Sequence, residues 1–310
     1  MKMTHHHISM ITKDLKANFH FYHDILGLRL VNKTVNQDST DMYHLFYGDY
    51  TGAPGTELTF FEIPLAGRTI RGTNAITRMG LLVPSYDSLV YWQQRLQELN
   101  VTHEPITKYA GYDVLAFEDS EGLRMLLINH NGQTVPEKWT YWPNSPVEEA
   151  HRILGLGPIE LTVQFPQKTI QVLQDVFSYT VIAEAEGVYR LQSEQVAYSE
   201  FIVVTQDGPS EKPGRGSIHH IAVRAGTKEN LVALNDQLKA LGYMTTNVVD
   251  RHYFESVYFR DGNNLLFEIA TDEPGFAHVA HVDELGATLH LPAALEHKRS
   301  EIESKLKPLQ

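Results

Sequence analysis

The feature that most constrains the fold is a repeat, because one pattern of strands and a helix occurs four times along the chain. Each copy reads as a strand, an amphipathic helix and then two or three further strands. The four helices are recognised by apolar residues at helical spacing: Leu15, Phe19, Tyr22 and Leu26; Leu89, Trp92, Leu96 and Leu99; Ile170, Leu173 and Phe177; Leu231, Leu234, Leu238 and Leu241. A repeat of this length is too long for a solenoid, so the pattern predicts four βαβββ modules.

The modules define the predicted fold class, which is α+β, with tandem βαβββ modules forming two paired-module domains of curved mixed sheets. Turn-rich segments at 118–122 and 260–264 separate apolar runs and predict β-hairpins. We expect modules 1 and 2 in residues 1–134 and modules 3 and 4 in residues 151–275. A Pro- and Asn-bearing linker at 135–150 divides them, and 276–310 forms a C-terminal tail with a surface helix at 293–306.

Composition excludes several classes of function. The 310 residues carry a net charge of −12, which disfavours nucleic acid and anionic membranes as partners because both attract clustered Lys and Arg. The chain has no cysteine, so a metal would need nitrogen and oxygen ligands. Neither a signal peptide nor a long apolar run is evident, and we therefore expect a cytoplasmic protein.

Two histidine pairs and one carboxylate are the candidate chemical groups. The strings His5-His6-His7-Ile8 and Ile218-His219-His220-Ile221 each place histidines at the start of an apolar strand, and Glu268 lies inside the apolar run at 264–269. One imidazole from each pair and this carboxylate would form a two-His, one-carboxylate face that leaves metal positions open. A charged Glu in a strand core is costly unless a partner such as a cation offsets it. Glu62, in a similar string at 59–63, is a rival carboxylate.

The positions of these groups within the repeat indicate which modules carry chemistry. The opening strands of modules 1 and 4 carry His7 and His220, whereas modules 2 and 3 have Met79 and Glu160 at about that place. If the first and last strands of module 4 are neighbours, His220 and Glu268 meet. We therefore expect modules 1 and 4 to form the site and modules 2 and 3 to be structural.

The chain resembles the vicinal oxygen chelate superfamily, which includes glyoxalase I, bleomycin-resistance proteins and extradiol dioxygenases, and it is most similar to ring-cleaving dioxygenases of hydroquinones. The resemblance spans nearly the whole length. It is carried by both His-His-Ile strings and by Phe21-Tyr22, Leu26-Gly27-Leu28-Arg29-Leu30-Val31, Tyr43-His44-Leu45-Phe46-Tyr47-Gly48-Asp49, Pro54-Gly55-Thr56, Asp250-Arg251, Tyr253-Phe254-Glu255-Ser256-Val257-Tyr258, Phe267-Glu268, Gly275-Phe276 and Glu284-Leu285-Gly286.

This resemblance implies a ring-cleaving, extradiol-type dioxygenase that acts on a hydroquinone- or catechol-like aromatic with O2. It implies Fe(II) as the metal, with Mn(II) or Zn(II) as alternatives, and it allows a homodimer. The implied metal ligands are His7, His220 and Glu268; the implied catalytic residues are Tyr258, Arg251 and His6; His219 and His252 are expected to bind substrate. Two alternatives remain open: a glyoxalase-like isomerase or lyase with Glu62 as a fourth ligand, and a drug- or quinone-binding protein without catalysis.

Overall fold

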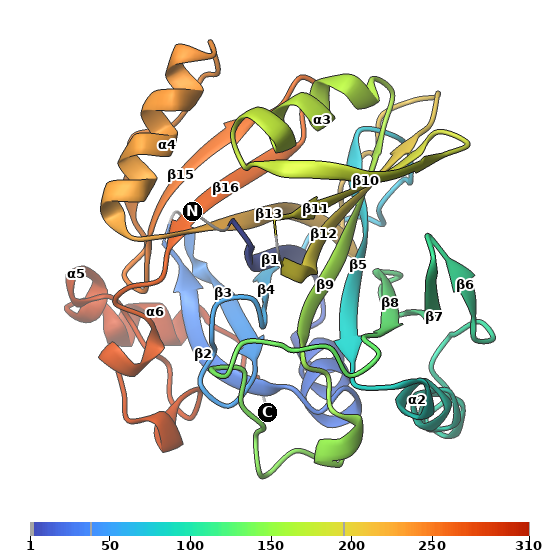
Figure 1. Ribbon diagram of the computed structural model, residues 1–310. Coiled ribbons are helices and arrows are strands. Elements are labelled where there is room, and N and C mark those ends of the chain that lie inside the picture. The colour runs from blue at the N-terminus through green and yellow to red at the C-terminus, as the bar shows by residue number, and fades with distance from the viewer. Residues whose placement is uncertain (1–2, 38, 195, 310) are drawn as a thin grey trace.

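The computed structural model describes residues 3–37, 39–194 and 196–309, and within these ranges the strands form two eight-stranded sheets (Figure 1). The first sheet has the order β14-β15-β16-β13-β1-β4-β3-β2 and the second has the order β10-β11-β12-β9-β5-β8-β7-β6. Modules 1 and 4 therefore share the first sheet, and modules 2 and 3 share the second. The predicted α+β class with four βαβββ modules is confirmed.

The strand bounds follow the predicted repeat. The first sheet comprises β1 His5–Thr12, β2 Arg29–Asn36, β3 Ser39–Gly48, β4 Glu57–Glu62, β13 Ser217–Gly226, β14 Val249–Asp250, β15 Glu255–Arg260 and β16 Leu266–Thr271. The second comprises β5 Ala75–Val83, β6 Thr107–Tyr109, β7 Tyr112–Glu118, β8 Arg124–Asn129, β9 Gly155–Val163, β10 Tyr179–Ala185, β11 Val188–Ser193 and β12 Val196–Thr205. The two predicted hairpins are present as the antiparallel pairs β7–β8 and β15–β16.

The two sheets join module 1 to module 4 and module 2 to module 3. The opening strand of module 1, β1, is hydrogen-bonded to that of module 4, β13, and β5 of module 2 is bonded to β9 of module 3. All four opening strands are mostly buried, whether their residues are polar or apolar, so burial alone does not specify which one pairs with which. The division of the chain into units 1–134 and 151–275 stays a prediction, but each sheet draws strands from both of these ranges.

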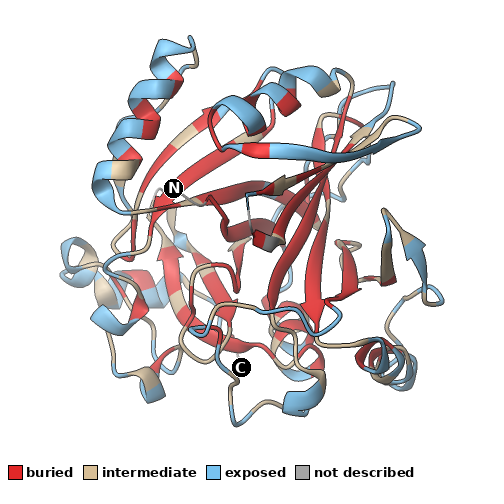
Figure 2. Cartoon of the chain, in the orientation of Figure 1, coloured by how far each residue is buried: buried red, intermediate tan, exposed pale blue. Residues whose placement is uncertain are grey.

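The module helices cover the outer faces of the sheets with the apolar stripes that the sequence predicts (Figures 1 and 2). They are α1 Leu15–Phe19, continued by the π-helix η1 His20–Ile25, then α2 Tyr86–Glu98, α3 Pro166–Asp175 and α4 Lys228–Ala240. Ser85 and Thr227 cap α2 and α4 by accepting backbone N–H groups at 3.2 and 3.3 Å. Leu99 and Leu241 are exposed because both helices end just before them.

The C-terminal tail packs against module 1, and its helix is broken in two. After the 3-10 turns η3 Phe276–His278 and η4 Val282–Glu284 come α5 Ala293–Glu296 and α6 Arg299–Lys305, in place of the single helix expected at 293–306; a further 3-10 turn, η2 Glu149–His151, lies in the linker. Ile302 of α6 is 1% exposed and packs with Val35 of β2. The backbone N–H of His290 donates to Lys33 O at 2.8 Å. Among the described helices, none is long and apolar enough to cross a bilayer.

Candidate metal centre and substrate cavity

The two histidine pairs meet because β1 and β13 run antiparallel at the centre of the first sheet, with Ser9 opposite His220. Each strand carries one extra residue near its pair, between His5 and Ile8 on β1 and at His219 on β13. A bulge re-aims the neighbouring side chains, so simple alternation does not separate the two members of each pair. Both pairs have the same internal contact, Nδ1 to Nδ1, at 3.0 Å for His6–His7 and 2.8 Å for His219–His220.

Glu268 completes the cluster from β16, which runs parallel to β13. Its Oε2 lies 3.1 Å from His7 Nε2 and 2.8 Å from His220 Nε2, and one ligand atom from each of the three residues falls within 4.8 Å of the others. The three residues that the sequence predicts as metal ligands are therefore brought together. All three are buried, and Glu268 has no exposed surface.

The protonation states of Glu268 and His220 are those that a metal needs. Burial would raise the pKa of the Glu268 carboxyl, but His7 and His220 hold this pKa well below its usual range, so the group is ionised. Burial lowers the pKa of His220, which leaves its imidazole neutral. The Nε2 atom of His220 is buried and faces the carboxylate of Glu268, 2.8 Å from Oε2. A buried nitrogen and a buried carboxylate in this arrangement fit a divalent cation between them.

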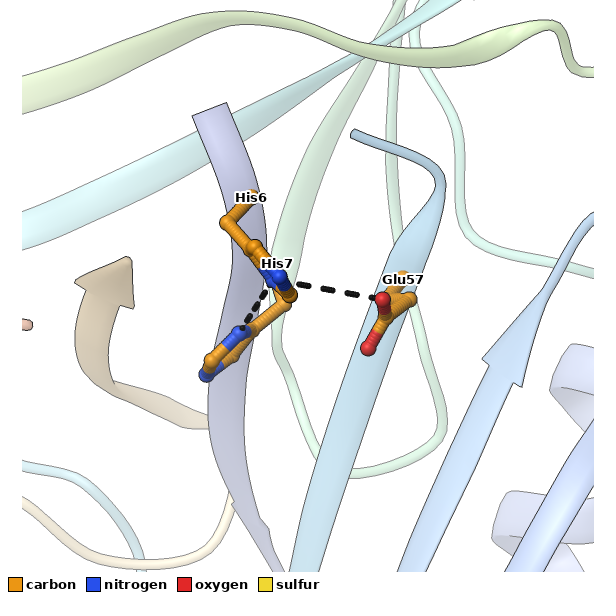
Figure 3. A group of neighbouring side chains, drawn as sticks. All are labelled: His6, His7 and Glu57. Carbon is orange, nitrogen blue, oxygen red and sulfur yellow. Dashed lines mark hydrogen bonds and ion pairs between the residues drawn. The ribbon is translucent and has the colours of Figure 1, made fainter. Parts of the chain in front are cut away.

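Groups behind the ligands fix the orientation of His7 (Figure 3). Burial lowers the pKa of His6 to about 3, so its ring is neutral. His6 Nε2 lies 3.0 Å from the carbonyl oxygen of Thr271, to which it donates, and His6 Nδ1 therefore accepts from His7 Nδ1. With Nδ1 directed at His6, His7 turns its Nε2 toward Glu268, 3.1 Å from Oε2, which is the nitrogen that would bind a metal. Ser256 Oγ holds the other oxygen of Glu268 by donating a hydrogen bond to Oε1.

His6, His7 and Glu57 form a second group with metal-ligand spacing (Figure 3). The carboxyl Oε1 of Glu57 is 3.9 Å from His6 Nδ1, and burial raises the pKa of Glu57 well above its usual range. A protonated acid is a poor cation ligand. The nitrogen of His7 on this side is already hydrogen-bonded to His6. The group with Glu268 is therefore the better metal site.

A cavity of about 430 Å³ opens above the cluster, and its size suits a small organic ligand. Its lining consists of His7, Ser9, Ile11, Thr34, Val35, Asn36, Gln37, His44, Phe46, Phe61, Ile63, His219, His220, Thr246, Arg251, Tyr253, Phe254, Tyr258, Leu266 and Glu268. Aromatic and aliphatic side chains share the walls with polar groups, which include the three residues of the metal-ligand cluster.

The predicted catalytic and substrate-binding residues divide into two sets. Tyr258 lies directly opposite Glu268 in the β15–β16 pair, Arg251 Nε donates to the Tyr258 hydroxyl at 3.1 Å, and both line the cavity with His219. Burial raises the pKa of Tyr258 far above its usual value, so the phenol is neutral. His6 and His252 do not line the cavity: His6 lies behind His7, and the ring of His252 stacks on His290 with centroids 5.2 Å apart.

Three polar residues of module 1, Ser9, His44 and Thr59, form a hydrogen-bonded group that the sequence reasoning did not single out. Ser9 comes two residues after His7, as Ala222 comes two residues after His220. Ser9 pairs with Thr59 and Ala222 pairs with Glu268, so Thr59 is the counterpart of Glu268 in module 1. Thr59 Oγ1 lies 2.7 Å from Ser9 Oγ and 3.1 Å from His44 Nε2. His44 could have been found from the string 43–47, in which alternation places it on the same face as Phe46.

The rival carboxylate Glu62 belongs to neither metal-binding group of the described residues. It lies three positions after Thr59 on the same strand, and an odd separation turns a side chain to the opposite face of a sheet. It accepts a backbone hydrogen bond from Tyr43 and lies near Lys307 of the tail. Glu62 is thus part of the packing between β3, β4 and the tail.

The second sheet has ion pairs where the first has the metal-ligand cluster. Gly80 pairs with Leu126 in module 2, as Ala222 pairs with Glu268 in module 4. The counterpart of His220, two residues before Ala222, is therefore Arg78 rather than Met79. The Nε of Arg78 lies 3.6 Å from Glu160, which also accepts hydrogen bonds from Thr77 and Tyr109. A guanidinium in place of an imidazole neutralises the local carboxylate without a metal, which agrees with a structural role for modules 2 and 3.

Comparisons with known proteins agree with this geometry. The family model described as "Glyoxalase/Bleomycin resistance protein/Dioxygenase superfamily" matches residues 4–127 and 155–269. The chain is 44% identical to the Bacillus subtilis protein named "Putative ring-cleaving dioxygenase MhqA", over 98% of each chain. It is 27% identical to a chlorohydroquinone/hydroquinone 1,2-dioxygenase of Sphingobium indicum, over 96% of this chain and 94% of that protein. A crystal structure from Bacillus subtilis, titled "putative dioxygenase", superposes with a TM-score of 0.92 at 32% identity, over 100% of this chain and 98% of that one.

Proposed function

Because the chain belongs to the glyoxalase, bleomycin-resistance and dioxygenase superfamily, we propose that it is a metal-dependent ring-cleaving dioxygenase of hydroquinone-like aromatics that uses O2. The relatives' names support the reaction class, and the cluster of His7, His220 and Glu268 in the lining of a partly aromatic cavity supports the metal and the substrate class. Fe(II) is the proposed metal, with Mn(II) or Zn(II) as alternatives, and cleavage is of the extradiol type.

One observation favours this function over a glyoxalase-like reaction. The glyoxalase alternative needs a fourth protein ligand, and Glu62, the candidate for that role, faces away from the cavity. The residue of module 1 that corresponds to Glu268 by register is Thr59, which is neutral, fully buried and hydrogen-bonded to Ser9 and His44. A face with three protein ligands leaves positions for substrate and oxygen together. The retained ligand set likewise argues against a binding protein without catalysis.

The residues around the cluster have distinct proposed roles. A metal bound by His7, His220 and Glu268 would supply the positive charge and the redox chemistry that bring an aromatic and O2 together. Arg251 places a fixed positive charge beside the cavity, where it would stabilise an anionic form of the substrate. Tyr258 holds its proton on Oη, within hydrogen-bond reach of Arg251, and can donate it to an oxygen of the bound substrate. His219 forms part of the cavity wall, while His6 positions His7. A cytoplasmic location and a homodimer stay predictions.

The experiment that tests the proposal is metal reconstitution under anaerobic conditions, followed by oxygen uptake. The protein loaded with Fe(II), Mn(II) or Zn(II) is mixed with hydroquinone, methylhydroquinone and catechol, and the products formed under labelled O2 are analysed by mass spectrometry. We expect one O2 consumed per ring cleaved, with both oxygen atoms in the product. Turnover of a hemithioacetal without oxygen consumption would move the assignment to isomerase chemistry, and aromatic binding without any turnover would leave a binding protein.

A further inference from the structure

His44 is a polar group of the cavity that the proposed mechanism does not yet use. It comes from β3, and its ring is held between Phe46 and Phe61, each with a centroid separation of 4.1 Å. Its Nε2 is anchored by Thr59 Oγ1, which in turn contacts Ser9 Oγ. The Nδ1 atom of His44 has no hydrogen-bond partner among the described residues. It is also absent from the fully enclosed atoms that lack a partner, so it is not sealed off from the cavity. Nδ1 is thus available to a ligand in the cavity.

The strand registers give the position of His44 relative to the metal-ligand cluster. Thr59 pairs with Ser9, and Ser9 pairs with the ligand His220, so these residues mark the level of the cluster along the strands. His44 pairs with Phe61, two residues farther along β4. Two residues of a strand span about 6.6–6.8 Å. Because Nε2 of His44 turns back to Thr59 and β3 lies two strands from β1, this step is only the along-strand part of the separation between His44 and the cluster.

Apolar side chains line the cavity along this same step. Ile11 pairs with Phe61 on the neighbouring strand, and Leu266 lies two residues from Glu268 in the same direction. An aromatic ring with one oxygen at the cluster would lie between these walls, and its opposite end would point away from the ligands into the cavity that His44 also lines. The ring of His44 is neutral, because burial lowers its pKa well below the usual value. A neutral imidazole nitrogen forms a hydrogen bond with a hydroxyl group in either tautomer.

We propose that His44 binds the second oxygen of a 1,4-dihydroxyaromatic substrate and thereby makes the cavity selective for hydroquinones over catechols and monophenols. In a catechol the second oxygen is adjacent to the first and stays near the metal ligands, and in a monophenol it is missing. Neither ligand can form the hydrogen bond to His44. This inference rests on the proposed function for the position of the first oxygen, and it names a specificity residue outside the metal-ligand set.

The test compares His44→Phe with the wild type in two separate measurements. Calorimetry under anaerobic conditions gives the Kd of hydroquinone, catechol and phenol for the metal-loaded protein, and oxygen uptake gives KM and kcat. Phenylalanine keeps a flat ring between Phe46 and Phe61 and removes both nitrogens. We expect the Kd and KM of hydroquinone to rise about tenfold, as for the loss of one hydrogen bond, and those of catechol and phenol to change less than twofold. Metal content should be unchanged.

Two further variants keep the test decisive. Thr59→Val removes the hydroxyl that anchors His44 and should raise the Kd of hydroquinone alone, by a smaller factor. His103→Phe makes the same substitution in the second sheet, outside the cavity, and should leave all three Kd values unchanged. An equal change for the three ligands in His44→Phe, or no change, overturns the inference, and so does a wild type that does not bind hydroquinone. If the wild type binds hydroquinone but consumes no oxygen, the proposed function fails while the Kd comparison still decides the role of His44.

Discussion

Replacing Glu268 with Gln should remove most of the stabilisation that a metal gives this protein. The amide has nearly the shape of the carboxylate but lacks its charge, and the group is fully buried between His7 and His220. Removing one partner of a buried charge pair costs about 3–5 kcal/mol, which corresponds to metal binding about 10²–10⁴-fold weaker. In the metal-free protein the same change also lowers the free energy of unfolding, because His7 and His220 hold the pKa of Glu268 low and therefore stabilise its ionised form.

The loss is measurable as a change in the melting temperature, Tm. Unfolding entropy is about 2.1 cal/mol/K per residue, hence about 0.65 kcal/mol/K for the 310 residues. A loss of 3–5 kcal/mol at saturating metal thus lowers Tm by about 5–8 °C relative to the metal-loaded wild type. Calorimetry with and without Fe(II) or Mn(II), under anaerobic conditions, separates this loss from a change in the apo protein. Glu62→Gln is the matched control and should keep the full metal-induced rise. A Glu268→Gln protein with the same rise as the wild type would refute the triad.

Three further predictions concern the cavity, a buried acid and the tail. Tyr258→Phe should keep the metal and the fold but slow ring cleavage by about 10²–10⁴-fold, whereas turnover equal to that of the wild type in an oxygen-uptake assay would show that the hydroxyl only packs. Burial raises the pKa of Asp119 to about 6, above its unfolded value near 4; its stabilising contribution is therefore fully present below pH 4 and is lost as the pH rises through 6. Denaturant titrations at pH 4 to 7 should show a decline in the free energy of unfolding of up to about 3 kcal/mol, reduced by solvent screening, which Asp119→Asn flattens. Ile302→Ala should lower stability by about 2–5 kcal/mol, because Ile302 holds the tail against Val35 and Leu291; an unchanged Tm would mean that this contact with β2 does not stabilise the fold.

The local features of this protein are determined by its sequence. Apolar spacing alone locates α2 and α4, since Leu89, Trp92 and Leu96 recur on one face and a Ser or Thr cap precedes each helix. The turn residues at 118–122 and 260–264 specify the hairpins. The two His-His-Ile strings and the buried Glu268 indicate a metal site because a charged group in an apolar strand requires a partner. Each of these signals spans only a few residues, so it can be detected without knowledge of distant contacts.

Contacts between distant segments were decided only by the tertiary structure. The opening strands of the modules are all mostly buried, so only their packing selects β1 with β13 and thereby joins His7 to His220. The bulges at both histidine pairs arise from this pairing, and alternation along one strand cannot show them. The string 59–63 does not show whether Thr59 or Glu62 corresponds to Glu268. The strand register shows that Thr59 is the counterpart and that Glu62 lies on the other face of β4. A one-residue shift exchanges the two faces of a strand, so the identity of each cavity residue depends on hydrogen bonds made by strands distant in sequence.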